Sequence, residues 1–299
     1  MYKKLLVPLD GSATAEAVLP YAEALAAGFK ASVELVSAMD IGAMATHMPT
    51  DKVHHLDAMI EAEEGNCARY LEKIAKTFFR VPTECRMVRG HAAETILEAS
   101  SKEPDTLIVM ATHGRSGAKR WLLGSVAEKV LRGTTHPLFL VRAAAAQESP
   151  QRIINSIVVP LDGSALAEKI LPTVCNWAQA LDVEVTLIRA FEFPASAYYG
   201  SKDELPDYDQ FREQARRQAA DYLKEKEDFL VREGVRTVSI VTIEGSAADE
   251  VIGYARTAPR AVIAMSTHGR TGIQRWLLGS VTEKVVRHGD DPVLVVRGE

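Results

Sequence analysis

Short runs of apolar and β-branched residues alternate along the chain with longer segments in which apolar residues recur at helical spacing. This alternation is typical of βαβ units, in which helices connect parallel strands. Continuous apolar runs such as Leu107–Met110 and Val262–Met265 indicate strands that are covered on both faces. Because crossovers between parallel strands are right-handed, such units build an open, doubly wound sheet.

The pattern predicts five strands in each half of the chain. In the first half, the strands are expected at Lys4–Leu9, Ser32–Ala38, Thr83–Val88, Thr106–Met110 and Leu138–Val141, with helices at Ala13–Gly28, Asp57–Phe79, Ala92–Ser101 and Ser125–Arg132. In the second half, they are expected at Ser156–Leu161, Glu184–Ala190, Thr237–Ile243, Ala261–Met265 and Val293–Val296. Gly28 is expected near the C-terminal end of the first helix.

The two halves repeat one another. Val7–Ser12 (VPLDGS) returns as Val159–Ser164 at an offset of 152 residues (159 − 7), and Arg120–Val126 (RWLLGSV) returns as Arg275–Val281 at an offset of 155 (275 − 120). Between the copies, Ala143–Pro150 contains small and polar residues and ends in proline, as a linker does. We therefore predict two α/β domains with five-stranded parallel sheets, at residues 1–146 and 150–299.

Composition and charge narrow the classes of protein. With 47% hydrophobic and 25% charged residues, the chain resembles an ordinary globular protein, and its net charge of −5 argues against a protein held on nucleic acid by its overall field. No apolar run is long enough for a signal peptide or membrane span, so we expect a cytoplasmic protein with no membrane partner. Three widely spaced cysteines, Cys67, Cys85 and Cys175, argue against disulfides and a structural zinc, and we expect buried free thiols.

The first candidate site is the turn after the first strand of each copy, Asp10-Gly11-Ser12 and Asp162-Gly163-Ser164. A carboxylate at the end of a strand can accept hydrogen bonds from ribose hydroxyls, and the glycine lets the chain turn. The alternative is a purely structural Asx turn whose serine caps the next helix. The sequence leaves both interpretations open.

The second candidate site follows the fourth strand. Ala111-Thr112-His113-Gly114, then nine residues, then Gly124-Ser125 is matched by Ser266-Thr267-His268-Gly269, nine residues and Gly279-Ser280. A glycine-containing loop that leads to a helix N-terminus offers backbone N–H groups to a phosphate. The alternative is again structural, with Ser125 and Ser280 as helix caps.

These motifs resemble the universal stress protein family across nearly the full length of both copies. The family pattern is G-2x-G-9x-G-[ST] after an apolar strand, with a P-x-D turn after the first strand. Both copies have the nine-residue spacing and the Gly-Ser ending, but Ala111 and Ser266 stand at the first glycine. The resemblance implies a Rossmann-like fold of the adenine nucleotide alpha-hydrolase type.

The resemblance also implies a nucleotide site in each copy, holding ATP, ADP or AMP, with Mg²⁺ as a candidate companion of the phosphates. In the first copy the implied contacts are Pro8, Ala38 and Met110 to adenine, Asp10 to ribose, and Gly114, Gly124, Ser125 and Val126 to the phosphates, with Ala111 at the place of the first glycine. In the second copy they are Pro160, Ala190, Met265, Asp162, Ser266, Gly269, Gly279, Ser280 and Val281.

Other chemistry is less well supported by the sequence. His113 and His268 occur at equivalent loop positions but have no identifiable orienting partner, so we predict no catalytic residue. His47, His54 and His55 could bind a metal but have no counterpart in the second copy, so we predict no metal site. Loop cations that could neutralise phosphate are Arg115, Lys119, Arg120, Arg270 and Arg275.

We therefore expect a nucleotide-binding protein that senses or regulates during stress. One alternative is slow ATP hydrolysis or phosphotransfer, and another is a nucleotide-free scaffold. The last strands, Leu138–Val141 and Val293–Val296, are apolar edges of the kind that pair with another edge. In the family that the chain resembles this strand forms dimers, which implies an intramolecular pseudo-dimer and leaves a homodimer open.

Overall fold

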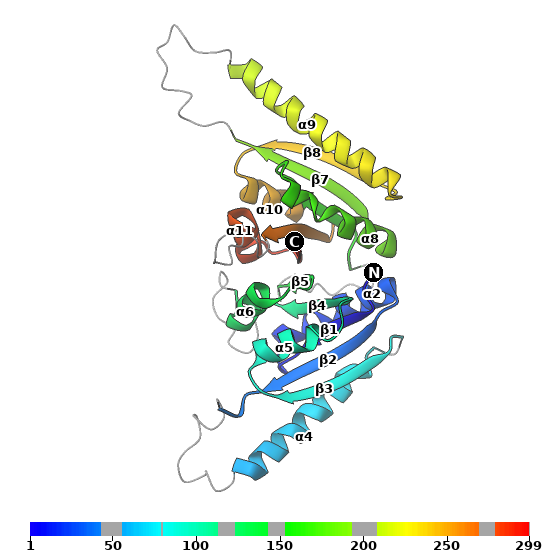
Figure 1. Ribbon diagram of the computed structural model, residues 1–299, viewed down its shortest axis with the longest axis vertical. Helices are drawn as coiled ribbons and strands as arrows, with labels where there is room; N and C mark the ends of the chain where they lie inside the picture. The colour runs from blue at the N-terminus through cyan, green and yellow to red at the C-terminus, as the bar shows by residue number, and fades with distance from the viewer. Residues whose placement is uncertain are drawn as a thin grey trace. The chain divides into compact units, whose positions relative to one another are not determined.

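The computed structural model describes residues 1–42, 56–78, 80–112, 123–142, 153–192, 208–268 and 279–298. It divides into two compact units, Met1–Ile153 and Ile154–Glu299, called domain 1 and domain 2 below. Each is an α/β domain with helices on both faces of a sheet (Figure 1). The linker Ala143–Pro150 lies outside the described residues, so the boundaries at 146 and 150 stay a prediction.

Domain 1 contains a five-stranded parallel sheet in the order β3-β2-β1-β4-β5. Its elements are β1 (Lys4–Pro8), α1 (Ala13–Glu16), α2 (Leu19–Phe29), β2 (Ser32–Met39), α4 (Leu56–Ala75), β3 (Thr83–Arg89), α5 (Ala92–Ser100), β4 (Thr106–Ala111), α6 (Ser125–Gly133) and β5 (Leu138–Val141). The chain runs outward from β1 to β3 and then returns to β4 on the other side of β1.

Domain 2 repeats this arrangement in the order β10-β9-β6-β7-β8, again with parallel strands. Its elements are β6 (Ser156–Pro160), α7 (Ala165–Glu168), α8 (Leu171–Leu181), β7 (Glu184–Phe191), α9 (Tyr208–Arg232), β8 (Val238–Glu244), α10 (Ala247–Thr257), β9 (Ala261–His268), α11 (Ser280–His288) and β10 (Val293–Gly298). The predicted fold class, two doubly wound parallel-sheet domains, is confirmed.

The single helix predicted at Ala13–Gly28 is wrong because the segment forms two helices. The helical segment breaks after Glu16 and starts again at Leu19, with Pro20 in the first turn of α2, because proline suits a helix start and not a helix interior. Gly28 lies near the C-terminal end of α2, as predicted, and the left-handed residue that ends the helix is Lys30, at φ 56°. Asp182 ends α8 in the same conformation.

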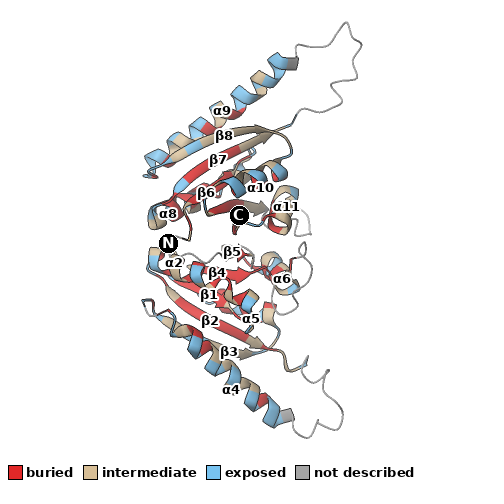
Figure 2. Ribbon diagram, turned by 180° about the vertical axis from the view of Figure 1, so that it is seen from behind, coloured by how far each residue is buried: buried red, intermediate tan, exposed pale blue. Residues whose placement is uncertain are grey.

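The core of each domain lies between its sheet and the surrounding helices. All six residues of β4 are buried, and Figure 2 shows buried residues along the central strands while α4 and α9 expose their outer sides. Cys175 is buried, and burial raises the pKa of its thiol to about 11. Cys85 is exposed on β3, the last strand of its sheet, so the prediction of buried thiols is wrong at that position. No helix in the described part of the chain is long and apolar enough to cross a bilayer.

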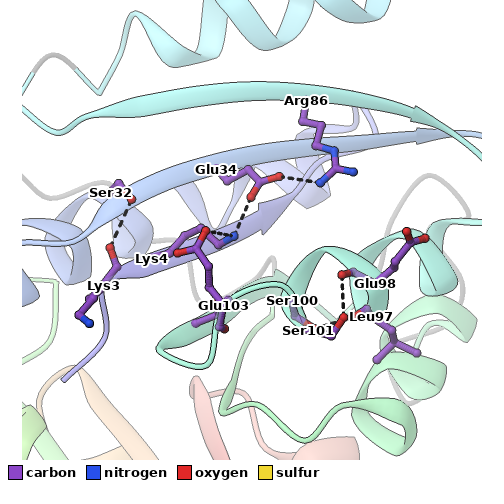
Figure 3. Close-up of polar contacts among 11 residues, drawn as sticks. Lys3, Lys4, Ser32, Glu34, Arg86, Leu97, Glu98, Ser100, Ser101 and Glu103 are labelled. Carbon is purple, nitrogen blue, oxygen red and sulfur yellow. Dashed lines mark hydrogen bonds and ion pairs between the residues drawn. The ribbon is translucent and has the colours of Figure 1, made fainter.

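A buried ionic network connects β1, β2 and β3 of domain 1 away from the carboxyl ends of these strands (Figure 3). The Lys4 ammonium lies 3.0 Å from Glu34 Oε2 and 2.9 Å from Glu103 Oε1, and Arg86 reaches the other Glu34 oxygen at 3.6 Å. Burial alone would lower the pKa of Lys4, but its hydrogen bonds to Glu103 and Glu34 outweigh burial and raise the pKa.

Domain 2 has no charge at the two central positions of this network. Ser156 and Thr186 occupy the places of Lys4 and Glu34, and the Thr186 hydroxyl lies 3.0 Å from that of Ser239. Ser156 donates to the carbonyl of Pro259 at 3.3 Å. The same position in the fold is therefore ionic in one domain and neutral in the other.

Lys4→Met should destabilise domain 1 by about 3 kcal/mol, because it leaves the Glu34 carboxylate buried with much weaker compensation. Adding Glu34→Gln should recover at least half of that loss, since the buried charge is then gone. Hydrogen exchange at the amides of β1 and β2 measures both effects, and Ser156→Ala in domain 2 is the neutral control. Equal destabilisation by the single and double variants would show that packing, and not charge, dominates at this position.

Candidate functional site

A cavity of about 310 Å³ opens at the carboxyl ends of the central strands of domain 1. Residues from β1, β2 and β4 line it, together with the first turns of α5 and α6. Because β1 pairs with β2 on one side and with β4 on the other, the connections leave it toward opposite faces and the chain opens a crevice there. The fold therefore places the cavity where a doubly wound sheet binds ligands.

The cavity has an apolar wall and a polar end. The wall is formed by Pro8, Val36, Ala38, Ile96 and Met110. Asp10 and the start of α6 supply the polar groups. Such a surface can cover a flat heterocycle while a few directed hydrogen bonds hold the rest of the ligand.

Domain 2 has a matching cavity of about 290 Å³. Pro160, Ile188, Ala190 and Met265 form its apolar wall, and Asp162 and the start of α11 lie at its polar end. The duplication seen in the sequence thus extends to the size and lining of the cavity.

The structure brings together every described residue that the resemblance assigned to a nucleotide site. Around the first cavity these are Pro8, Asp10, Ala38, Met110, Ala111, Gly124, Ser125 and Val126, and around the second they are Pro160, Asp162, Ala190, Met265, Ser266, Gly279, Ser280 and Val281. Gly114 and Gly269 lie outside the described residues, as do His113 and the loop cations Arg115, Lys119, Arg120, Arg270 and Arg275.

The turn after the first strand has a structural role in both domains. Asp10 Oδ1 accepts hydrogen bonds from the amide and hydroxyl of Ser12 at 3.0 and 2.6 Å, and Ser12 in turn caps α1. Ser164 donates its amide to Asp162 Oδ1 at 2.8 Å and caps α7. The Asx-turn interpretation is therefore observed, and the same aspartates also line the cavities.

Gly11 and Gly163 let this turn form. Their φ angles are 79° and 90°, in the region that side chains with a Cβ rarely adopt. In domain 2, a Cβ on residue 163 would also lie only 3.2 Å from a guanidinium nitrogen of Arg189.

Asp162 is held in its charged form. Burial disfavours the carboxylate, but hydrogen bonds from Ser164 and the nearby Arg189 guanidinium outweigh this effect, so the pKa of Asp162 is lowered. An ionised carboxylate only accepts hydrogen bonds, so this side chain suits a ligand that presents hydroxyl groups.

The helices at the polar ends begin with a glycine and not with the predicted serine cap. Gly124 is the N-cap of α6 and Gly279 that of α11, and neither helix has a side-chain cap. Ser125 and Ser280 are the first helical residues, so the alternative in which they cap the helices is wrong. The amides of the first turn lack intrahelical acceptors and lie beside the cavity, where they can bind an anion.

The ends of the loop between β4 and α6 are tied together. The Gly124 amide donates to the Thr112 carbonyl at 2.8 Å, and the Thr112 amide donates to the Val141 carbonyl at 2.9 Å. These bonds fix the start of α6 against β4 and β5. The position of the helix N-terminus beside the cavity is therefore set by backbone contacts.

The two cavities differ where the family pattern has its first glycine. Ala111 adds one methyl group in domain 1. In domain 2, the Ser266 hydroxyl donates to the Leu166 carbonyl of α7 at 2.6 Å. The Ser266 hydroxyl, which alanine lacks, thus has a backbone acceptor. This hydrogen bond explains how a serine is accommodated beside the cavity.

Sequence reasoning predicted the helix after the third strand, at Ala92–Ser101, but did not assign its residues to the site. Ala92, Thr95 and Ile96 of α5 line the first cavity, and Ala247 and Val251 of α10 line the second. The signal was present, because Ala92 and Ala247 are 155 residues apart, the same offset as the glycine-serine motifs. A small residue at that helix start lets the cavity extend beneath it.

No group of three or more histidine, cysteine, aspartate or glutamate side chains that could hold a metal ion occurs within the described ranges. His47, His54 and His55 lie outside those ranges.

The sequence model of the Universal stress protein family matches residues 1–142 and 154–297. The chain belongs to this family. A universal stress protein of Methanocaldococcus jannaschii is 33% identical over 144 residues, which are 48% of this chain and 83% of that protein.

Two solved structures extend the comparison. The crystal structure of a universal stress protein from Archaeoglobus fulgidus covers 100% of both chains with a TM-score of 0.71 and 20% identity, and so shares the fold. A universal stress protein solved in complex with cAMP is 20% identical, with a TM-score of 0.36 over 49% of this chain and 98% of that one.

Gly163→Ala should destabilise domain 2 by about 1–2 kcal/mol, because alanine is strained at positive φ and its methyl group meets Arg189. Gly253→Ala is the matched control in the same domain. Residue 253 is an exposed position inside α10 with open space around it, so alanine there should stabilise by about 0.5–1 kcal/mol. Urea denaturation of the whole chain measures both, and effects of the same sign would contradict the assignment of the turn.

Proposed function

We propose that each domain of this universal stress protein binds an adenine nucleotide, with ATP as the first candidate, and that the chain acts as a cytoplasmic regulator in the stress response. The observation that carries the proposal is the repeated cavity. In both domains, an apolar wall, a turn aspartate and an open helix N-terminus surround a single space.

Each part of an adenine nucleotide has a chemically matching group in the lining of the cavity. The apolar wall formed by Ala38 and Met110 would cover the adenine ring, and Asp10 would accept hydrogen bonds from the ribose hydroxyls. The amides of Ser125 and Val126, at the positive end of the α6 dipole, would hold phosphate oxygens. The corresponding groups of domain 2 would act in the same way.

The sizes of the cavities are compatible with this assignment. At about 310 and 290 Å³, they lie near the lower end of the range of roughly 300–1,000 Å³ typical of small-molecule sites. An adenosine moiety would fill most of the space, and the outer phosphates would extend past the helix N-terminus.

Mg²⁺ would accompany the phosphates. The only carboxylate among the described residues that line each cavity is the turn aspartate, which already accepts hydrogen bonds from a serine. A magnesium ion needs several oxygen ligands, and phosphate oxygens and water would supply them.

The residues that line the two cavities favour nucleotide binding over rapid nucleotide hydrolysis. Among the described lining residues of either cavity there is no histidine, and no second carboxylate is available as a general base. Rapid hydrolysis needs a base held near the attacking water. A regulatory role, in which bound nucleotide alters how the protein meets its partners, therefore fits the described site better than rapid catalysis.

Gly124→Asp should remove nucleotide binding from domain 1 without unfolding it. The new carboxylate would occupy the N-cap, bond to the open amides of α6 and repel phosphate, while stabilising the helix by about 0.5 kcal/mol. Gly279→Asp should do the same in domain 2. Calorimetry with ATP should give two sites per chain for the parent protein, one for each single variant and none for the double variant.

Gly124→Ser and Gly279→Ser are the matched controls, because a hydroxyl caps the helix without adding charge. They should weaken ATP binding less than aspartate does. AMP, GTP and cAMP complete the ligand set, the last because one universal stress protein was solved with it. Unchanged ATP stoichiometry in the double aspartate variant would rule out these helix termini as the phosphate sites, and absence of any nucleotide binding by the parent would favour the nucleotide-free scaffold.

A further inference from the structure

A cluster of charged and aromatic side chains lies behind the Asp162 turn of domain 2. The Arg189 guanidinium carbon is 4.6 Å from the centre of the Tyr222 ring, and the Tyr222 hydroxyl donates to Glu168 Oε1 at 3.0 Å. The Lys226 ammonium pairs with the same oxygen at 3.1 Å and lies 5.3 Å from the ring centre. The cluster thus links β7, α7 and α9.

Arg189 reaches the turn from the face of the sheet opposite the cavity. Its neighbours Ile188 and Ala190 line the cavity, and successive side chains of a strand alternate between faces. The guanidinium nevertheless lies against the turn, because a Cβ on Gly163 would be 3.2 and 3.4 Å from its two terminal nitrogens. The Asp162-Gly163 backbone is therefore supported from behind by a planar cation.

Domain 1 has the same frame without the cations. Tyr70, Glu16 and Asp10 occupy the positions of Tyr222, Glu168 and Asp162, but Ser37 and Ile74 replace Arg189 and Lys226. Burial and a neighbouring glutamate raise the pKa of both tyrosine hydroxyls, Tyr70 beside Glu16 and Tyr222 beside Glu168, so the two domains differ here in the cations. The cluster is therefore a specific addition to domain 2.

We propose that Arg189 is a positioning residue for the nucleotide site of domain 2, holding the Asp162 turn ready to accept the ribose hydroxyls and keeping that site occupied at acidic pH. This inference rests on the proposed binding of an adenine nucleotide. Tyr222 holds the guanidinium by stacking, and Glu168 in turn accepts a hydrogen bond from the Tyr222 hydroxyl, so α9 stands behind the ribose end of the site.

The charges around Asp162 explain the expected pH dependence. Arg189 from β7, Tyr222 from α9 and Ser164 from the turn itself act on Asp162, and Glu168 of α7 and Lys226 of α9 pair with each other beside Tyr222. The two cations balance the two carboxylates. Burial opposes ionisation of Asp162, and Ser164 and Arg189 reverse this effect, so its pKa is low. Without Arg189 that pKa would rise, and the carboxylate would take up a proton at a higher pH as the solution is acidified.

The test uses the full chain with Gly124→Asp, so that domain 2 holds the remaining site. Arg189→Gln keeps a planar group but removes the charge, and Arg189→Lys keeps the charge but loses the stacking. ATP affinity is measured between pH 7.5 and 4.5, and the ratio between variants cancels the titration of the nucleotide itself. Arg189→Gln should weaken binding about tenfold at neutral pH, which is one lost charge-supported contact, and should shift the acid loss of affinity to higher pH.

Arg189→Lys should retain the parental pH profile with about a threefold loss of affinity. The matched control is Ser37→Ala in the chain with Gly279→Asp, where the corresponding position of domain 1 carries no cation and the pH profile should stay unchanged. Carbon-13 titration of the Asp162 carboxyl in the ligand-free protein checks the cause directly, because Arg189→Gln should raise its midpoint even before nucleotide is added.

The outcomes separate the two proposals. If the Gly124→Asp chain binds ATP and adding Arg189→Gln changes neither the affinity nor its pH profile, the role of Arg189 is overturned. Nucleotide binding is then still supported. Absence of ATP binding in the parent chain overturns both. A parallel loss of affinity at every pH, with an unshifted Asp162 titration, would show that Arg189 acts only through packing and would also overturn the proposal.

Discussion

The place of the first strand of each domain between two parallel neighbours is the constraint on which the rest of the structure depends. β1 lies between β2 and β4, and β6 lies between β7 and β9, so the chain must leave these strands toward one side and return on the other. The crevice that results collects whatever follows the strand ends. A turn aspartate, two helix starts and several small apolar residues therefore meet there, although they are far apart in the sequence.

Much of this could be predicted because it depends on local patterns. Apolar runs separated by helix-length segments predict the strands of the sheet. The duplicated Asp-Gly-Ser and Gly-Ser motifs mark the edge at which the carboxyl ends of these strands lie. Sequence reasoning failed where a single residue changes a local choice. Pro20 breaks a helix that periodicity would have continued, and Gly124 takes the capping position that a serine usually occupies.

The charged residues that support the Asp162 turn and the sheet could not be predicted from the sequence, for a different reason. Arg189 stands between the apolar residues Ile188 and Ala190, which is a visible signal, but Tyr222, whose ring it covers, comes from α9, and Glu168, which accepts from Tyr222, comes from α7. The periodicity of a strand or helix predicts on which face of that element a residue lies. It does not predict which residues of other elements contact it. The Lys4–Glu34 pair was missed in the same way, since both residues lie inside strands that were assigned on their apolar neighbours.

The two domains place charged side chains at opposite ends of the same framework, with Lys4 and Glu34 buried and Arg189 half-buried. Domain 1 holds Lys4 and Glu34 near the amino ends of β1 and β2, far along these strands from the cavity, whereas domain 2 holds Arg189 near the carboxyl end of β7, against the turn that lines the cavity. A buried charge restricts its surroundings because it must keep its partners. In domain 1 this restriction acts on the register of the strands, and in domain 2 it acts on the turn that would carry the ribose. Two cavities of similar size and lining can therefore differ in affinity, because the difference lies in the groups that support each wall and not in the wall itself.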